Sequence, residues 1–335
     1  MTVAERVTGR VSVGGETFRI VLGGKKPQSE EAGVQTNLRV STRSTNQAGV
    51  ARVTVLDGGG VISAGDELSV SVQNERLHTG TVTKTESGVG DRIRVTSFDA
   101  LHQLKQTFIS ETFDRESASV AVRSIADTAG VSVNASAPVL TRTISTSFKD
   151  VRADAALEKI TKLTDTILFV NTKNTVVIGS AAELAFDLKI GARRPLSRLI
   201  ETSAGARRPQ YQSVQVIGNT PTSKRGREAR HLISSQPVLS QAGEGQPSFI
   251  FEDDSITSQE QANSVARSLL RRLTEQQQGG FAVVVGRPRI RPFDTVVFPE
   301  QQGGSTFLVS GVEHTISERS GFTTRLELGG TGTER

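Results

Sequence analysis

The side chains best suited to catalysis or metal binding are four histidines and a short acidic run, and neither set forms a recognisable site. His78, His102, His231 and His314 are isolated, and none has the neighbours of a zinc motif such as H-E-x-x-H. The acidic run 252–254 could bind a cation, but it also precedes a predicted helix, whose dipole favours negative charge there. The chain has no cysteine, which excludes disulfides, thiolate metal sites and cysteine nucleophiles. We therefore expect a protein that is not an enzyme and that has no cofactor and no metal site.

The basic residues form a second candidate site because they are concentrated in one stretch. The whole chain carries 40 basic and 35 acidic residues, for a net charge of +5. Between Arg193 and Arg230 there are nine basic residues and two acidic ones. This stretch can be a solvated loop, a surface that docks onto an acidic partner, or a nucleic-acid contact. If it docks onto a partner, Arg225, Arg227 and Arg230 are the candidate docking residues, and replacing all three with Ser should weaken docking without unfolding the protein.

Strands dominate the first hundred residues. Apolar and polar residues alternate over 51–55 and 68–72, and β-branched runs follow at 79–85 and 92–98. Turns rich in Gly, Asp and Ser separate these runs, which predicts an antiparallel meander. Because short strands leave open edges, we expect either a closed barrel or a partner that pairs with the edges.

Helical spacing appears in the middle of the chain and again in its last third. The region after the meander is predicted to be a small α+β unit, followed by a connector over 203–247 with a single strand at 214–217. The predicted helices cover 118–129, 153–163 and about 257–273, and the remaining predicted strands cover 167–170, 175–178, 281–285, 295–298, 307–312 and 323–328.

The last strands repeat features of the early ones. Asp66, Gly80 and Arg92 in the first stretch correspond to Asp294, Gly311 and Arg325 in the second, at offsets of 228, 231 and 233 residues. The differences between these offsets fall in turns. The echo therefore indicates an internal duplication, with chance similarity between two meanders as the alternative.

Two long runs of strand and turn motifs occur in a definite order. The first comprises GDELSVSV (65–72), LHTGTVTKTESGVGDRIRVTSFDALHQLK (77–105) and the helix SASVAVRSIADTAGV (117–131). The second comprises SLLRRL (268–273), GGFAVVVGRPRIRPFDTVVF (279–298) and TFLVSGVEHTISERSGFTTRLEL (306–328). Over about 50–185 and 255–328 the chain resembles the phage late control protein D and baseplate hub family, to which the N-terminal part of VgrG spike proteins is related. Residues 1–49 match nothing in that family that we can place.

The resemblance implies a homotrimeric hub in which each chain contributes two tube-like β-barrels, so that three chains form a ring of six. Residues 65–98 and 281–328 would supply the barrels, and 112–185 would face other baseplate proteins. The ring would join the tail tube protein to a separate spike or tip protein in a virion tail assembled in the host cytoplasm. A genome could pass through its channel without sequence-specific binding.

The predicted fold class is α+β, mostly β, with two tube-type antiparallel β-barrel domains flanking a small α+β domain. The domain boundaries follow from the pattern and the resemblance together: a first barrel over 1–107, the α+β domain over 108–185, a basic connector over 186–250 that could complete a barrel, and a helix plus second barrel over 251–335.

The alternative to a structural hub is a cell-wall or nucleic-acid binding module without catalytic activity. A cell-wall module would need aromatic platforms for sugars, yet 112–185 contains only Phe113, Phe148 and Phe169. A nucleic-acid contact through the basic stretch predicts steep salt dependence. The longest strongly apolar run, about 281–285, is far shorter than the roughly 20 residues of a membrane span, so no membrane insertion is expected.

Overall fold

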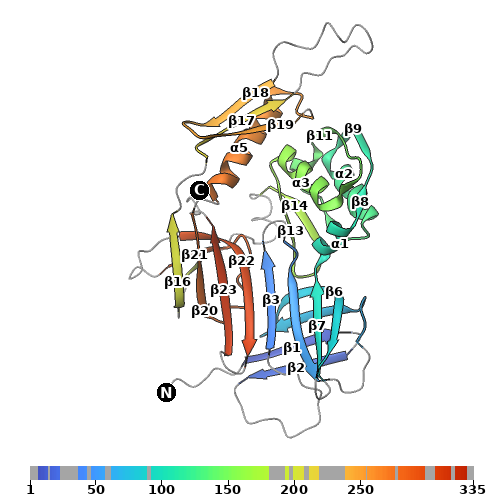
Figure 1. Cartoon of the computed structure of the whole chain (residues 1–335), viewed down its shortest axis with the longest axis vertical. Coiled ribbons are helices and arrows are strands. Elements are labelled where there is room, and N and C mark those ends of the chain that lie inside the picture. Colours follow the sequence, from blue (N-terminus) through green and yellow to red (C-terminus); the bar gives the residue numbers. More distant parts are fainter. Residues whose placement is uncertain are drawn as a thin grey trace.

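The structure is a computed structural model that combines one large sheet with two smaller units. It describes residues 7–13, 16–22, 37–43, 47–56, 62–88, 92–180, 193–195, 199–206, 211–218, 238–253, 255–275, 278–298, 306–317 and 321–329. Figure 1 shows the large sheet at one end of the molecule, with a helical unit and a smaller sheet at the other end.

Seven strands form the first β-unit, and alternating residues explain why strands such as β5 bury one face. In β5, for example, Leu68, Val70 and Val72 are buried and the residues between them are not. The strands are β1 (Val7–Val13), β2 (Glu16–Leu22), β3 (Asn37–Arg43), β4 (Val50–Leu56), β5 (Glu67–Val72), β6 (Glu75–Ser87) and β7 (Arg92–Phe98).

The α+β unit follows directly; α2 and α3 begin and end close to the predicted positions, whereas α1 was not predicted. In α2 the apolar residues recur on one face, and Ala118, Val122 and Ile125 are buried. The elements are α1 (Ala100–Gln106), β8 (Phe108–Ile109), β9 (Thr112–Ser117), α2 (Ala118–Thr128), β10 (Val133–Asn134), η1 (Pro138–Thr141), β11 (Thr143–Ser147), β12 (Val151–Arg152), α3 (Ala153–Thr164), β13 (Ile167–Val170) and β14 (Val176–Gly179).

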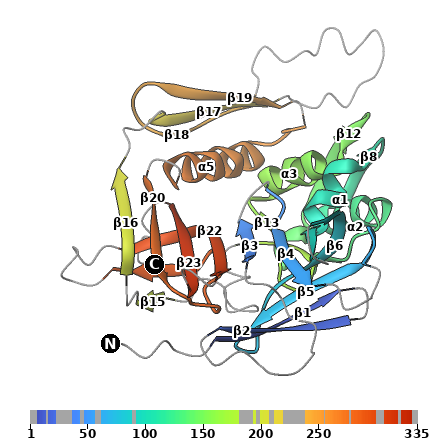
Figure 2. The ribbon, with the colours of Figure 1, turned by 60° about the horizontal axis from the view of Figure 1, so that its bottom comes forward.

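The remaining elements build a second β-unit and a three-stranded sheet covered by a long helix. They are β15 (Arg193–Pro195), β16 (Leu199–Ala206), β17 (Ser213–Gly218), β18 (Val238–Gly243), β19 (Ser248–Asp253), α5 (Gln259–Glu275), β20 (Gln278–Val285), β21 (Thr295–Val297), β22 (Thr306–Ser317) and β23 (Gly321–Gly329). Helix α5 packs on β17 and β18 and lies between their sheet and the large sheet (Figure 2).

The two β-units share one sheet of 13 strands. Its order is β16-β20-β23-β22-β3-β4-β7-β6-β5-β1-β2, with β21 paired to β22 and β15 paired to β21. All of these pairs are antiparallel except β15–β21, which is parallel.

The prediction of a mostly β, α+β fold is confirmed, whereas closed barrels are not found among the described strands. Val11 of β1 and Val40 of β3 belong to one hydrophobic core, which shows that the sheet curls. However, β2 pairs with β1 and not with β3, so no described pairing closes the first unit. The second unit likewise ends at β16 on one side and β15 on the other. Instead of two separate barrels, the structure shows two curled units fused along β3 and β22.

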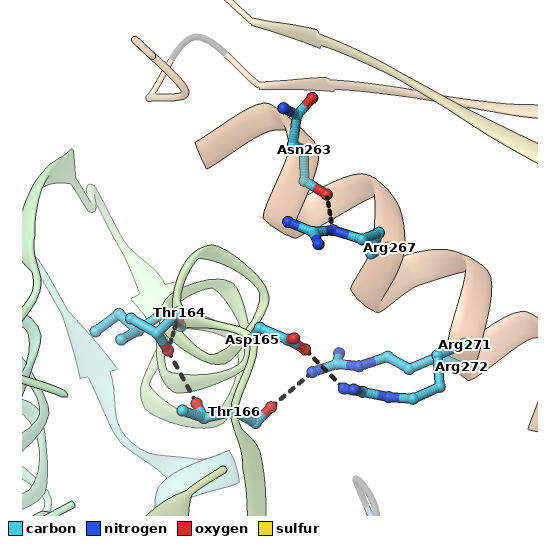
Figure 3. A network of polar contacts seen from close by, with 8 residues as sticks. Thr164, Asp165, Thr166, Asn263, Arg267, Arg271 and Arg272 are labelled. Carbon is cyan, nitrogen blue, oxygen red and sulfur yellow. Dashed lines mark hydrogen bonds and ion pairs between the residues drawn. The ribbon is translucent and has the colours of Figure 1, made fainter. Parts of the chain in front are cut away.

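A polar junction holds the α+β unit against α5. Helix α3 ends at Asp165, whose backbone is in the left-handed region, and the Asp165 carboxylate lies 2.6 Å from the Arg271 guanidinium. Arg272 donates a hydrogen bond of 2.9 Å to the carbonyl oxygen of Thr166 (Figure 3). Leu163 extends from α3 into the core formed with α5. Apolar packing and charge therefore fix the two elements together.

Candidate assembly surface

Metal-ligating side chains do not cluster in the described part of the chain. No group of three or more His, Asp or Glu side chains in that part could hold a metal ion. None of its helices has the length and hydropathy of a membrane span. Of the four histidines, His231 lies outside the described residues, and His102 stacks on the Phe98 ring with centroids 4.5 Å apart.

His78 and His314 are both buried in the large sheet, and burial explains their protonation state. Desolvation lowers the pKa of His78 to about 4 and that of His314 to about 3. His78 Nε2 lies 3.1 Å from the Ser97 hydroxyl, and His314 Nδ1 lies 3.0 Å from the Thr324 hydroxyl. Both rings are therefore neutral, hydrogen-bonded parts of the core.

Asp66 and Asp294 occupy equivalent turns. The Asp66 carboxylate accepts a hydrogen bond of 2.8 Å from the Ser63 amide, and the Asp294 carboxylate accepts one of 3.0 Å from the Arg291 amide. At each aspartate, the same pair of main-chain bonds ties the turn to the second strand that follows it, which is β6 in the first unit and β22 in the second. These bonds are Gly65 N to Val82 O and Val82 N to Asp66 O in the first unit, and Phe293 N to Val309 O and Val309 N to Asp294 O in the second, all 2.8 Å.

The strands after these turns are equivalent as well, in a register that differs from the sequence echo. The pairing of β6 with β7 shifts between Val82 and Lys84, and the pairing of β22 with β23 shifts between Val309 and Gly311. Matching these irregularities places Gly311 at the position of Lys84, not of Gly80. Continuing along the hairpins, Glu86–Arg94 corresponds to Glu313–Arg325, so Arg325 occupies the place of Arg94 and not of Arg92.

The echo residues have different local roles. A Cβ on Gly80 would lie 2.3 Å from the carbonyl oxygen of Phe98, so only glycine fits at this point of β6. Arg92 is exposed at the start of β7. The Arg325 guanidinium lies 3.9 Å from the centre of the Phe281 ring, a cation–π contact within the second unit. The structure does not bring the six residues together. The basic candidates Arg225, Arg227 and Arg230 lie outside the described residues.

The pairing of β3 with β22 joins the two units and was not predicted. Seven consecutive residue pairs connect these strands, from Asn37–Ser317 to Arg43–Gly311. Across this seam Arg39 Nη2 lies 2.5 Å from Glu313 Oε2. Ile316 of β22 also packs in the core of the first unit. The units are therefore fused through hydrogen bonds, an ion pair and a shared core.

A polar row crosses the fused sheet on the face opposite its core. Pairing places six residues side by side on six successive strands, namely Thr323, Thr315, Arg39, Arg52, Thr96 and Lys84. Arg52 is exposed and has no ion pair with a described residue. It lies directly opposite another cation, Arg39. This face therefore presents charge and hydroxyl groups without interruption across both units.

Two strand edges in positions equivalent to the seam pair with no other described strand. Among the described strands, β16 pairs with β20 alone, and it exposes Ile200. In β6, the part from Lys84 to Ser87 pairs with β7 on one side only, because β5 reaches no further than Thr81. Unpaired edges of this kind are templates for pairing with another chain. We take these two edges as the candidate assembly surface.

The same architecture occurs in solved proteins of phage tails. No protein-family profile and no curated protein matches this sequence. A tail protein from Neisseria meningitidis superposes with a TM-score of 0.70 at 12% identity, over 96% of each chain. The 43 kDa tail protein of prophage MuSo2 from Shewanella oneidensis gives 0.68 at 12% identity, over 97% of this chain and 98% of that one. An Escherichia coli type VI secretion component, described as structurally similar to phage T4 tail proteins, gives 0.59 at 8% identity, over 92% and 76%. The chain therefore has the fold of phage tail proteins and of a type VI secretion component, as its resemblance to the baseplate hub family predicts.

Proposed function

We propose that this chain is a structural tail or baseplate hub protein, three copies of which close into a ring between the tail tube and a separate spike or tip protein. Its role is assembly without chemical turnover, in the virion tail of a tailed virus or in a phage-like injection device. The tube protein, the spike and other baseplate proteins are its partners, and assembly takes place in the host cytoplasm. The fold shared with tail proteins supports this role, and the pairing of β3 with β22 is the main observation behind the proposal.

The seam carries the proposal because its two strands belong to equivalent units. By pairing order, β3, β4, β7, β6 and β5 of the first unit correspond to β16, β20, β23, β22 and β21 of the second. Within one chain, the first strand of one unit thus pairs with the fourth strand of the other. The two remaining strands of those kinds are β16 and β6; one edge of β16, and the edge of β6 from Lys84 to Ser87, pair with no described strand.

Repeating the same seam between copies joins β16 of one copy to β6 of the next. The pair Thr315–Arg39 then has Gly88–Ser203 as its counterpart, and the pair His314–Val40 has Ser87–Ala204. In one chain β16 and β6 lie on opposite sides of the sheet in both views (Figures 1 and 2), so this pairing needs a second copy. Such a head-to-tail contact closes into a ring when the rotation fits. Three copies then give six units joined by six similar seams.

Cross-linking across the inter-copy seam tests the proposal. Glu86 and Ser203 are the counterparts of Glu313 and Arg39, which touch across the internal seam. Since the chain has no native cysteine, the double variant Glu86→Cys/Ser203→Cys can be joined with a short bis-maleimide. We expect bands of two and three chains on a denaturing gel, ending in a closed trimer.

The matched control moves one cysteine two strands inward on the same face. Arg52→Cys/Ser203→Cys keeps an exposed thiol on β4 and should give no products above the monomer. Absence of oligomers in the Glu86→Cys/Ser203→Cys variant, or equal yields in both variants, would count against the seam and the ring.

A further inference from the structure

The polar row on the outer face of the large sheet places two guanidinium groups directly opposite each other. Arg39 of β3 pairs with Arg52 of β4 in the antiparallel register. Directly opposed residues have Cβ atoms about 4.5–5.5 Å apart, and like charges at such positions destabilise the pairing. Arg39 contacts Glu313, whereas Arg52 makes no ion pair with a described residue. One of the two positive charges therefore lacks a counter-charge in the described part of the chain.

Further cations lie on the same face of the first unit. Lys84 of β6 belongs to the same row, and Arg94 of β7 lies one row away, where it pairs with Glu86. Glu86 lies 2.6 Å from Lys84 Nζ and 4.0 Å from Arg94 Nη1. With the two opposed arginines, four cations thus face two carboxylates, Glu86 and Glu313, and two positive charges remain in excess. We call the four cations the basic cluster: Arg39, Arg52, Lys84 and Arg94.

The basic cluster is present in one of the two equivalent units and largely absent from the other. In the second unit the counterparts of Arg39, Arg52 and Lys84 are Ser203, Phe281 and Gly311. Arg94 alone has a basic counterpart, Arg325, whose guanidinium lies over the Phe281 ring. Because the second unit has the same strand order without these charges, the fold does not require the cluster.

The composition of the polar row favours the phosphate backbone of a nucleic acid over an acidic protein. Its other members are Thr96, Thr315 and Thr323, so the row contains hydroxyl groups and no apolar or aromatic side chain. Protein interfaces have an apolar, aromatic-rich centre, and proteins that bind single strands stack the bases on aromatic rings. Contacts to duplex phosphates need only groups such as Arg, Lys and Thr.

The spacing of the cations suits a polyphosphate as well. Three strand spacings of about 4.8 Å separate Arg39 from Lys84, so these cations span roughly 14 Å. Phosphates of one DNA strand follow each other every 3.4 Å or so along the helix axis, so this span covers about four of them.

We propose that the basic cluster binds the phosphate backbone of a double-stranded nucleic acid without reading its sequence. Arg52 donates charge-assisted hydrogen bonds to a phosphate oxygen, and the added negative charge relieves its repulsion with Arg39. The side chains of Arg39 and Lys84 are 56% and 63% exposed, so both can reach the same backbone. The inference goes beyond the proposed hub role. Because the cluster lies on a sheet face and the ring seam uses strand edges, its failure would leave that role standing.

Fluorescence anisotropy with a short labelled duplex DNA of random sequence tests the proposal on the full-length chain. Arg52→Ser should raise the Kd about eightfold at 0.1 M salt, which is the counterion-release contribution of one phosphate contact. It should also reduce the slope of log Kd against log salt concentration by about 1, and Arg52→Ser/Lys84→Ser should reduce it by about 2. Arg52→Lys keeps the charge and should therefore keep the slope.

The matched control is Arg123→Ser, which removes the same charge from an exposed position on α2 and should leave both the Kd and the slope unchanged. Three results would overturn the proposal. The first is no binding of the duplex even at low salt. The second is an equal loss of affinity in Arg52→Ser and Arg123→Ser, which would reflect the net charge of the chain alone. The third is displacement of the duplex by poly-glutamate as readily as by unlabelled duplex of equal charge, which would assign the cluster to an acidic protein.

Discussion

Ile316 tests most sharply whether the two β-units form one body. It lies on β22, which belongs to the second unit in sequence, yet its side chain is fully buried in the core of the first unit with Leu38 and Val40. The variant Ile316→Ala should therefore destabilise both units, although the substituted strand belongs to only one of them.

The expected magnitude follows from the complete burial of the side chain. Ile→Ala substitutions in cores cost about 2–5 kcal/mol, and a site with no exposed surface should fall near 3–4 kcal/mol. Val309→Ala is the matched control, because Val309 lies on the same strand and is equally buried, but in the core of the second unit. Its cost should be about 2 kcal/mol.

Hydrogen exchange followed by mass spectrometry separates the two outcomes. Ile316→Ala should speed amide exchange in β3 and β4 as well as in β22, by roughly 150- to 900-fold where exchange requires opening of the core. Val309→Ala should speed exchange in β20, β21 and β23 and leave β3 and β4 nearly unchanged. If Ile316→Ala left the exchange of β3 and β4 at the wild-type rate, the fusion of the two units would be refuted.

Three further predictions concern Gly80, His314 and the ion pair of Asp165 with Arg271. Gly80→Ala should lower the free energy of unfolding, measured by urea denaturation, by about 1–3 kcal/mol because the added Cβ would clash with the main chain. The control Gly88→Ala, whose Cβ would make only ordinary contacts, should change it by less than about 1 kcal/mol. Burial lowers the pKa of His314 from 6.5 to about 3. As the pH falls, this histidine is therefore protonated in the unfolded chain before it is protonated in the folded chain. Stability present at neutral pH is thus lost as the pH falls from 6.5 to about 3. His314→Asn should flatten the measured dependence by up to about 1.4 kcal/mol per pH unit; an unchanged slope would contradict the assignment. Asp165→Asn and Arg271→Ala should each lower the free energy of unfolding by at most about 1 kcal/mol, because both side chains are about a third exposed. The double variant should lower it no more than either single variant. Additive losses would show that the pair does not interact.

Elements whose sequence pattern is set by local burial could be predicted. Strand β5 alternates buried and unburied residues, and α2 buries Ala118, Val122 and Ile125 at helical spacing, so one face of each element is readable in the sequence. The turn aspartates Asp66 and Asp294 could be matched because both turns need a side chain that accepts an amide hydrogen bond.

The register of the duplication and the seam could not be predicted, because both depend on contacts distant in sequence. The bulges after Val82 and Val309 lie at equivalent positions and reveal the register, in which Gly311 corresponds to Lys84; residue type alone favours the match with Gly80, because a glycine stands there. Strand β3 pairs with β22, which lies more than 260 residues further along the chain, and the sequence of β3 does not identify that partner. Strands β18 and β19 were not predicted because their apolar residues do not mark the buried face: β18 buries Ser240 and exposes Leu239, and β19 exposes Ile250.

The mass of the purified chain in solution tests the central claim most directly. Light scattering on the peak from a sizing column, with electron microscopy of the same fraction, gives both the number of copies and their arrangement. We expect a mass three times the 35.8 kDa of one chain, with rings of six similar lobes that fall apart when Ser203→Pro prevents β16 from pairing. A protein that remained monomeric at high concentration and formed no ring with its tube or spike partner would contradict it.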